Sequence, residues 1–253
     1  MLTVALVLFL MSGGSPCADT TRSVHSYGGI VRMDTTQRAI YLVFTGHEFA
    51  DGGENIRKTL HGQGIKASFF FTGDFYRNPS FRSVITGLQS DGHYLGPHSD
   101  KHLLYVSWEN RDSLLVSREE FLRDLNGNYA AMESLGIFRN TPLYFMPAYE
   151  WYNDSIAAWC NQTGITLVNF TSGTSSNADY TFPDLGARYV PSDTILTRIL
   201  RVERNSPSGL NGFLLLTHIG ADPARPDKFY RRLDSLITIL RARGYDFRSL
   251  KDE

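Results

Sequence analysis

Short apolar runs alternate along the chain with stretches that repeat hydrophobic residues every three or four positions. The apolar runs predict buried strands at 39–46, 66–73, 93–96, 143–147, 164–170, 213–218 and 245–250. The amphipathic stretches predict helices at 54–62, 79–90, 117–135, 153–162, 192–204 and 227–243. Ser117 and Glu120 have the spacing of a capping box, which marks the start of the third of these helices.

The strands carry no polar face, and a helical stretch separates most of them. Runs such as YLVF and FLLL are apolar at every position, as expected of parallel strands that are covered on both sides. About seven strands alternating with helices predict an α/β fold, a deformed parallel β/α barrel. In such barrels the chemistry lies where the strands end. This rule selects residues 45–51, 72–74, 98–102, 147–150, 169–180 and 218. Most of the segment 169–180 lies within a polar loop at 171–191.

Composition and charge limit the class of protein. The 253 residues are 42% hydrophobic and 20% charged, which suits one globular domain with a sizeable core. The formal net charge of −1 gives no long-range attraction to nucleic acid or to an anionic membrane surface. We expect no nucleic-acid partner, no membrane span and a monomeric protein.

The N-terminus predicts export. Its apolar run, LTVALVLFLM, precedes small residues and is too short for a membrane span. We expect a signal peptide at 1–18, a catalytic domain at 19–253 and a periplasmic, extracellular or cell-surface location. Cys17 offers lipid attachment as an alternative, although Pro16 fits a lipoprotein signal poorly. Once Cys17 is removed, only Cys160 remains, so an intrachain disulfide is ruled out.

Two histidines suggest a metal site. His98 and His102 stand four positions apart in PHSDKH, directly after a predicted strand. If Ser99 begins a helical turn, both imidazoles can face one ion. A hydrolytic site adds a carboxylate ligand and an open position for water. The segment TGHEFADGG offers His47, Glu48 and Asp51, of which Glu48 is our first choice and Asp51 our second. This donor set favours zinc, with cobalt or nickel as alternatives.

His218 ends the most apolar strand and is a candidate general acid. Such a histidine needs a carboxylate to hold its tautomer. Asp179 is the nearest candidate partner, and Asp184 and Asp227 are alternatives.

The order of these segments resembles the polysaccharide deacetylases, carbohydrate esterase family 4. The resemblance covers roughly residues 39–250, and it rests on KASFFFTG, PHSDKH, MPAYEWYN, ADYT and LLLTH. It implies a metal-dependent hydrolase that removes N- or O-linked acetyl groups from a polysaccharide. It also implies that His98 and His102 bind the metal, that His218 is the catalytic acid and that Asp179 orients it. Tyr149 then supplies a backbone N–H to the oxyanion.

The chain also departs from the family pattern. Thr45 and Gly46 stand where the family has its first-strand aspartates, the general base and the third metal ligand, and Met146 replaces an arginine that pairs with the base. In one explanation, Glu48 binds the metal while Glu150, or else Asp51, acts as the base. In another, hydrolysis is lost and a metal- or carbohydrate-binding protein remains. A third is an unrelated barrel metallohydrolase.

Aromatic residues are frequent in the segments predicted to surround the site. They suit either sugar stacking or simple loop packing, and they are Tyr76, Tyr105, Trp108, Trp151, Tyr152 and Tyr180.

Overall fold

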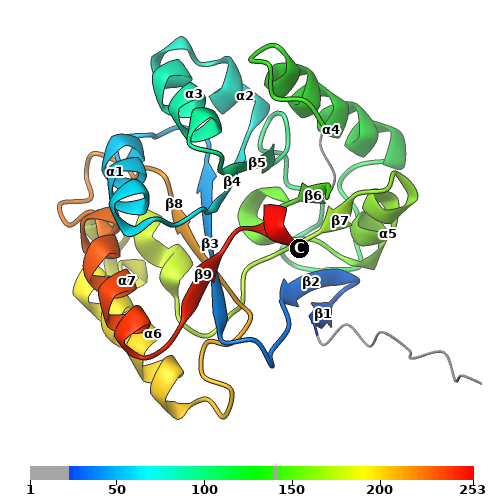
Figure 1. The fold of residues 1–253 in the computed structure, drawn as a ribbon. Coiled ribbons are helices and arrows are strands. Elements are labelled where there is room, and N and C mark those ends of the chain that lie inside the picture. The colour runs from blue at the N-terminus through cyan, green and yellow to red at the C-terminus, as the bar shows by residue number, and fades with distance from the viewer. Residues whose placement is uncertain (1–22, 140–141) are drawn as a thin grey trace, which may run out of the picture.

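A computed structural model describes residues 23–139 and 142–253 (Figure 1). The predicted signal peptide and Cys17 lie outside the described residues, so both stay predictions. Within the described part of the chain, no helix is both long and apolar enough to cross a membrane.

A parallel sheet runs through the centre of the molecule. Its middle strand, β3 (Ala39–Gly46), is buried at every position and pairs with β8 (Phe213–His218) on one edge. On the other edge β9 (Asp246–Arg248) pairs with the first residues of β3, and β4 (Ser68–Phe71) pairs with the last ones. Outside β4 lies β5 (Tyr94–Pro97). These parallel strands confirm the expected α/β class.

Short strands and single contacts complete the barrel. The strands are β1 (Val24–Ser26), β2 (Gly29–Arg32), β6 (Tyr144–Phe145) and β7 (Thr166–Leu167). The Met146 N–H donates to the Pro97 carbonyl at 3.3 Å and links β6 to β5, and a bridge between Ile30 and Val168 links β2 to the end of β7. The barrel is therefore deformed as predicted, but the β1–β2 hairpin in it was not foreseen.

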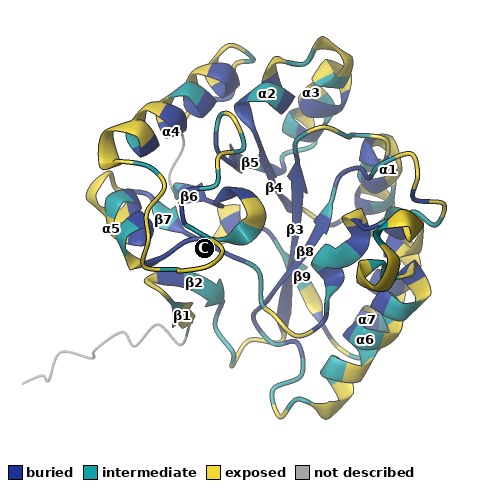
Figure 2. Ribbon diagram, turned by 180° about the vertical axis from the view of Figure 1, so that it is seen from behind, coloured by how far each residue is buried: buried dark blue, intermediate teal, exposed yellow. Residues whose placement is uncertain are grey.

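The helices surround the sheet and turn their buried faces toward it (Figures 1 and 2). They are α1 (Gly53–Gln63), α2 (Gly73–Arg77), α3 (Arg82–Ser90), α4 (Arg118–Glu133), α5 (Asp154–Gln162), α6 (Ser192–Asn205) and α7 (Leu233–Ala242). The capping box of Ser117 and Glu120 is present at α4. α2 was not predicted, and the expected helix at 227–243 begins as a 3₁₀ turn and becomes α-helical at Leu233. The loop 171–191 contains two further 3₁₀ turns, at Ser176–Tyr180 and Pro183–Arg188.

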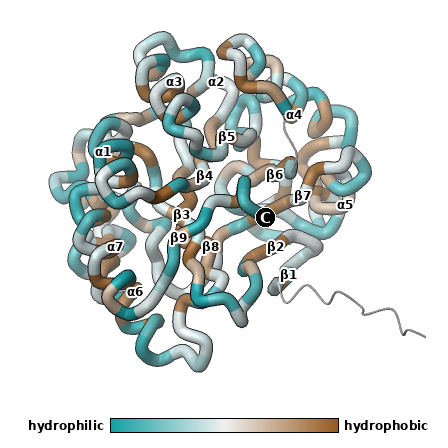
Figure 3. Tube along the Cα trace, viewed as in Figure 1, coloured by the Kyte–Doolittle hydropathy of each residue, from teal (hydrophilic) through white to brown (hydrophobic). Residues whose placement is uncertain are grey.

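The hydrophobic core has two layers, with the sheet between them. Ile40, Leu42 and Phe44 of β3 pack toward the helices, whereas Tyr41 and Val43 belong to a smaller cluster on the other face. This alternation follows from the two-residue period of a strand. Hydrophobic residues accordingly concentrate along the central strands (Figure 3). Because β3, β4, β5 and β8 are parallel, their carboxyl ends meet at one end of the barrel.

Candidate active site

A cavity of about 490 Å³ lies at the carboxyl ends of the strands. It brings together side chains from five separate loops, namely His47, Glu48, His98, His102, Trp108, Tyr149, Glu150, Asn177, Tyr180, His218 and Asp222. Most of the polar candidates from the sequence therefore share one cavity.

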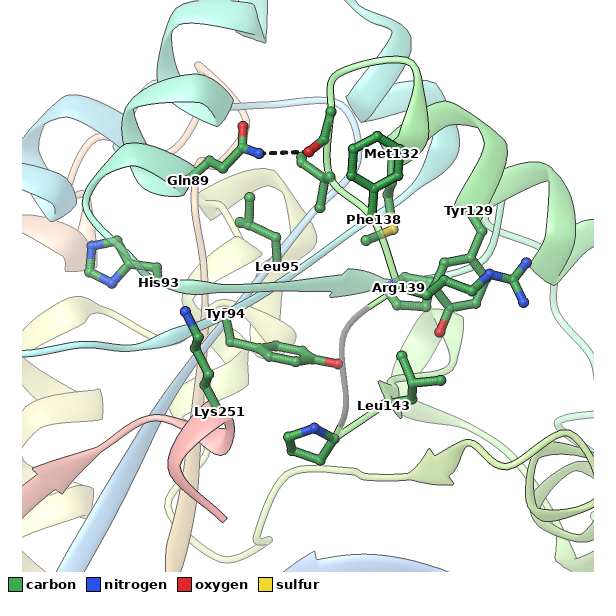
Figure 4. A pocket seen from close by; sticks show the side chains of 14 residues that line it. Gln89, His93, Tyr94, Leu95, Tyr129, Met132, Phe138, Arg139, Leu143 and Lys251 are labelled. Atoms are coloured by element: carbon green, nitrogen blue, oxygen red, sulfur yellow. Dashed lines mark hydrogen bonds between the residues drawn. The ribbon is translucent and has the colours of Figure 1, made fainter.

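A second cavity, of about 200 Å³, is lined by residues that precede or begin β5 and β6, including His93, Tyr94 and Leu143 (Figure 4). Its histidine is engaged in the fold, because the Ala67 N–H donates to Nδ1 of His93 at 3.1 Å. None of the described lining residues of this second cavity is a carboxylate.

His98 has a fixed tautomer. Its Nδ1 donates to the Met146 carbonyl at 2.9 Å, so Nε2 is left as the free acceptor. That Nε2 lies 3.9 Å from Oε1 of Glu150. Burial, followed by the neighbouring His102, holds the pKa of His98 well below its usual value. The ring is therefore neutral at physiological pH, as a metal ligand or a hydrogen-bond acceptor requires.

His102 sits among aromatic rings. Its ring centroid is 5.4 Å from that of His98, 4.5 Å from that of His47 and 4.3 Å from that of Tyr149. Burial, followed by the charges of His47 and His218, lowers the pKa of His102 to about 3. Nδ1 of His47 lies 3.1 Å from Oγ1 of Thr72, so His47 is held beside the pair.

The segment that carries the histidine pair is a loop, and the expected helical turn at Ser99 is wrong. Ser99 and His102 have left-handed backbones, with φ of 72° and 55°. Such φ values are uncommon for residues with a Cβ and persist where surrounding contacts impose them. Here the contacts come from two polar side chains of α4, and sequence reasoning missed them although it predicted the helix.

Asp124 and Asn128 of α4 hold this loop. The Asp124 carboxylate accepts hydrogen bonds from the backbone N–H groups of Asp100 and Lys101, at 3.0 and 3.2 Å. Oδ1 of Asn128 accepts from the His98 N–H at 2.9 Å. Both residues are buried and stand four apart on one face of a helix. Two polar residues on a helix face expected to be apolar were the signal available in the sequence.

His218 and Asp179 form a tight pair, as predicted. Nδ1 of His218 donates to Oδ1 of Asp179 at 2.6 Å, and Oδ2 of the same carboxylate accepts from the His218 N–H at 2.9 Å. Burial alone lowers the pKa of His218, but the charge and hydrogen bond of Asp179 outweigh it and raise the pKa above its usual value. The imidazole is therefore suited to hold a proton and to donate it from Nε2.

Glu150 is buried in the same cavity on a strained backbone. Tyr149 and Glu150 have successive left-handed φ angles of 60° and 53°, and Nδ2 of Asn169 donates to the Glu150 carbonyl at 2.8 Å. Its side chain is 12% exposed. Burial raises the pKa of Glu150 to about 7, with a smaller opposing effect from His218. Strain and burial of this kind are typical of functional groups.

Asp51 does not line the cavity, and its expected role as base or ligand is corrected. Its carboxylate accepts from the Ala221 N–H at 2.8 Å and from the Tyr230 hydroxyl at 3.0 Å, and it pairs with Lys228 at 3.3 Å. The Gly52 N–H donates to the Ile219 carbonyl at 3.0 Å, and this contact directs Asp51 toward the loop after β8. Asp51 therefore joins two loops.

The side chains present do not form a complete metal site. The two imidazoles fit an ion, because Nε2 of His98 is free and its Nδ1 is held by a carbonyl. Glu48 lines the cavity but is exposed. Among residues 23–139 and 142–253, no group of three or more His, Cys, Asp or Glu side chains is arranged to hold an ion. The expectation that Glu48 completes the metal site is therefore not met.

The aromatic candidates fall into two groups. Trp108 and Tyr180 are 57% and 52% exposed and line the cavity, whereas Tyr76, Tyr105 and Tyr152 are buried in the core. For these three, the sugar-stacking interpretation is wrong. Trp151 is half-buried beside Trp108.

Comparison with known proteins identifies the family. The family model "Polysaccharide deacetylase" matches residues 32–168, which is more than half of the chain. The chain belongs to the polysaccharide deacetylase family. A comparison of this deacetylase-family chain with curated proteins finds no significant match.

Solved structures of family 4 carbohydrate esterases share the fold of this polysaccharide deacetylase family member. One is a pseudoenzyme of that family from Bacillus anthracis, with 17% identity, a TM-score of 0.68, and coverage of 90% of this chain and 69% of the other. A peptidoglycan N-acetylglucosamine deacetylase has 18% identity, a TM-score of 0.69, and coverage of 89% and 92%. An acetyl xylan esterase from Clostridium thermocellum, bound to a cobalt ion, has 19% identity, a TM-score of 0.63, and coverage of 85% and 89%. Both active and inactive proteins therefore have this fold.

The departures from the family pattern have a structural basis. A Cβ atom on Gly46 would lie 2.7 Å from Cγ2 of Ile219 and 2.9 Å from Cδ1 of Phe71, so the space for a side chain is filled. Thr45 is buried and lines the cavity, and its Oγ1 has no hydrogen-bond partner. Met146 is fully buried in the smaller core cluster. A side chain at position 46 would require Ile219 and Phe71 to move.

Proposed function

We propose that this protein hydrolyses acetyl groups, N- or O-linked, from a polysaccharide outside the cell. The observation that carries the proposal is that Glu150 and His218 line one cavity at the carboxyl ends of the strands, with His218 paired to Asp179. The first supplies a proton acceptor and the second a proton donor. The deacetylase and the acetyl xylan esterase with the same fold support this chemistry.

In the proposed reaction, Glu150 accepts a proton from a water molecule while the oxygen of that water attacks the acetyl carbonyl. A base with a pKa near the working pH is effective in this role. Nε2 of His218 then protonates the departing sugar nitrogen or oxygen, while Asp179 stabilises the imidazolium. The family resemblance adds the Tyr149 N–H as an oxyanion donor, which stays a prediction. The products are acetate and the free amine or hydroxyl.

A divalent cation, zinc first, is the cofactor that the family implies, and a cobalt ion is bound in the acetyl xylan esterase. His98 and His102 are the residues through which this chain would hold it. Since they lack a third partner in the described residues, metal binding is a separate question for experiment.

A second function is favoured by one specific observation. Thr45 and Gly46 supply no carboxylate, and the packing around Gly46 leaves no room for one. A carbohydrate-binding protein without hydrolytic activity would have this feature, and a pseudoenzyme with the same fold exists. This alternative predicts sugar binding without acetate release.

Acetate release from acetylated xylan and from chito-oligosaccharides tests the two functions. We expect the wild type to release acetate and Glu150→Gln to lose activity about 100-fold or more. Glu54→Gln, which alters an exposed carboxylate on α1, is the matched control and should retain activity. Acetate release at equal rates by Glu150→Gln and the wild type would exclude Glu150 as the base. Sugar binding with no release by the wild type would favour the binding protein.

A further inference from the structure

An exposed tryptophan stands at the edge of the cavity. Trp108 is 57% exposed and lies in the loop between β5 and α4. This loop is a small hairpin, in which Val106 bridges Leu114 and the Ser107 N–H donates to the Ser113 carbonyl at 2.9 Å. The ring is therefore carried by an ordered segment of backbone.

Contacts beneath the ring hold it in place. The Trp151 ring lies 5.2 Å from that of Trp108 at an angle of 31°, and its Nε1 donates to the Ser107 carbonyl at 3.1 Å. The Arg111 guanidinium lies 3.8 Å from the centre of the Trp151 ring, and its Nε donates to the Tyr152 carbonyl at 2.7 Å. Because these contacts already hold the Trp108 ring, its side chain loses little conformational entropy when a ligand stacks on it.

The aromatic surface leads to the reacting groups. The Trp108 ring meets that of Tyr149 edge to face at 5.8 Å, and Tyr149 lies against His102. Tyr180, which is also exposed, lies 5.5 Å from the ring of His218. Apolar rings therefore accompany both the histidine pair and the proposed acid, and Trp108 is continuous with the cavity.

The ionisable lining of the cavity, apart from its histidines, is acidic. Glu48, Glu150 and Asp222 line it, and none of the described lining residues is a lysine or an arginine. Lys228, which is near this rim, is engaged by Asp51 at 3.3 Å and by the carbonyl oxygens of Ala221 and Asp222 at 2.8 and 2.7 Å. The imidazole of His218 is already paired with Asp179 at 2.6 Å, so an anionic sugar would meet the negative charge of the lining carboxylates.

We propose that Trp108 binds the pyranose ring next to the one that loses its acetyl group, and that the site selects uncharged polysaccharide chains over polyanionic ones. The apolar CH face of a pyranose suits the exposed indole, and the carboxylates of the lining repel uronate or sulfate groups. The inference rests on the proposed function, because it requires that an acetylated sugar occupies the cavity.

Isothermal titration calorimetry with defined sugars tests the proposal apart from catalysis when every protein carries Asp179→Asn, which slows acetate release and keeps all carboxylates of the lining. The probes are chitohexaose and acetylated xylohexaose as uncharged chains, hexagalacturonate as the anionic chain, and N-acetylglucosamine as the single ring. We expect Trp108→Ala to weaken binding of an uncharged hexamer about tenfold, which corresponds to about 1.4 kcal/mol, and to leave the single sugar unaffected. Trp108→Phe should recover most of the affinity. Phe138→Ala, which removes a 65% exposed ring that lines the second cavity, is the control.

The outcomes separate this inference from the proposed function. Equal hexamer affinity for Trp108→Ala and the wild type, or no sugar binding at all, would overturn the inference. Hexagalacturonate is expected to bind at least tenfold more weakly than the uncharged hexamers at 50 mM salt, and less so at 300 mM. Equal binding of the anionic and uncharged hexamers would overturn the charge selection.

Trp108-dependent binding without acetate release would leave the inference standing and refute the hydrolytic function. Acetate release by the wild type, with no effect of Trp108→Ala on hexamer affinity, would support the hydrolytic function and overturn the inference. Affinity for only one uncharged hexamer identifies which chain the site takes.

Discussion

The buried carboxyl of Glu150 makes the protein less stable as the pH rises. In the folded protein burial raises its pKa from 4.5 to about 7, whereas the unfolded chain keeps the ordinary value. The folded state therefore binds this proton more tightly, and stability from this group falls as the pH rises from about 4.5 to about 7. Replacing Glu150 by glutamine keeps the size of the side chain and removes the titration.

The size of the effect follows from the shift. One pKa unit corresponds to about 1.4 kcal/mol, so the ionisation of Glu150 costs the folded state about 3 kcal/mol at pH 8 relative to pH 4. The side chain is 12% exposed, so solvent screening reduces this value only modestly. For a domain of marginal stability this is a substantial fraction of the total free energy of unfolding.

Urea unfolding of metal-free protein, followed by tryptophan fluorescence between pH 4 and pH 8, measures the effect. The difference in unfolding free energy between Glu150→Gln and the wild type should grow by about 3 kcal/mol over this range. A constant offset from the buried amide does not affect this slope. Glu54→Gln, at an exposed position, should follow the wild type. In acetate-release assays, kcat/KM of the wild type should rise through about pH 7 as Glu150 ionises.

Parallel pH profiles for Glu150→Gln and the wild type would refute the reasoning. They would show that the carboxyl is hydrated or paired in solution, and the case for Glu150 as a base with a raised pKa would fail. A difference in unfolding free energy that grows with pH, together with full activity of Glu150→Gln, would support the burial of Glu150 and exclude its catalytic role.

Three further predictions follow from the site. Asp179→Asn should lower the pKa of His218, because burial then acts without the opposing Asp179 carboxylate, and should reduce acetate release about 100-fold or more. NMR titration of the imidazole and the activity assay measure these two effects, and an unchanged pKa of His218 would contradict the prediction. Zinc should bind with a dissociation constant no lower than about micromolar, and binding should be lost in His98→Ala, because the site offers two imidazoles and no third ligand among the described residues. A nanomolar dissociation constant in calorimetry would show that a carboxylate moves to the ion. Gly46→Asp should destabilise the fold by about 2 kcal/mol or more through overpacking against Ile219, whereas Gly62→Asp, at an open position, should cost less; equal denaturation midpoints would refute the packing argument.

The sequence predicted the elements that carry their own signal. β3 and β8 are long, mainly apolar runs, and the start of α4 has a complete capping box, so all three elements were placed within two residues. The β1–β2 hairpin was missed because its short strands are largely half-exposed and have no long apolar run. Strands of this kind are stabilised by their neighbours in the barrel, which a single sequence does not display.

The candidate site was predicted in part for the same reason. His98, His102, His218 and Glu150 lie at or just after the ends of strands, so the barrel rule brings them to one cavity, and Asp179 contacts His218 there. The conformation of the 98–102 loop was wrong because it depends on hydrogen bonds to Asp124, 24 residues from Asp100 in the sequence. Asp51 was misplaced because a backbone hydrogen bond from Gly52 to Ile219 turns its carboxylate away.

The packing around Gly46 has a consequence for engineering this site. A mutation that introduces an acidic residue at this position meets Ile219, Phe71 and Phe75, all within 3.0 Å of the added Cβ atom. These three side chains come from the loop after β8, from β4 and from α2, so they are expected to couple to one another in any repacking. The chemistry of this cavity is therefore more easily altered by substitutions at Glu150 than by a carboxylate placed at the end of β3.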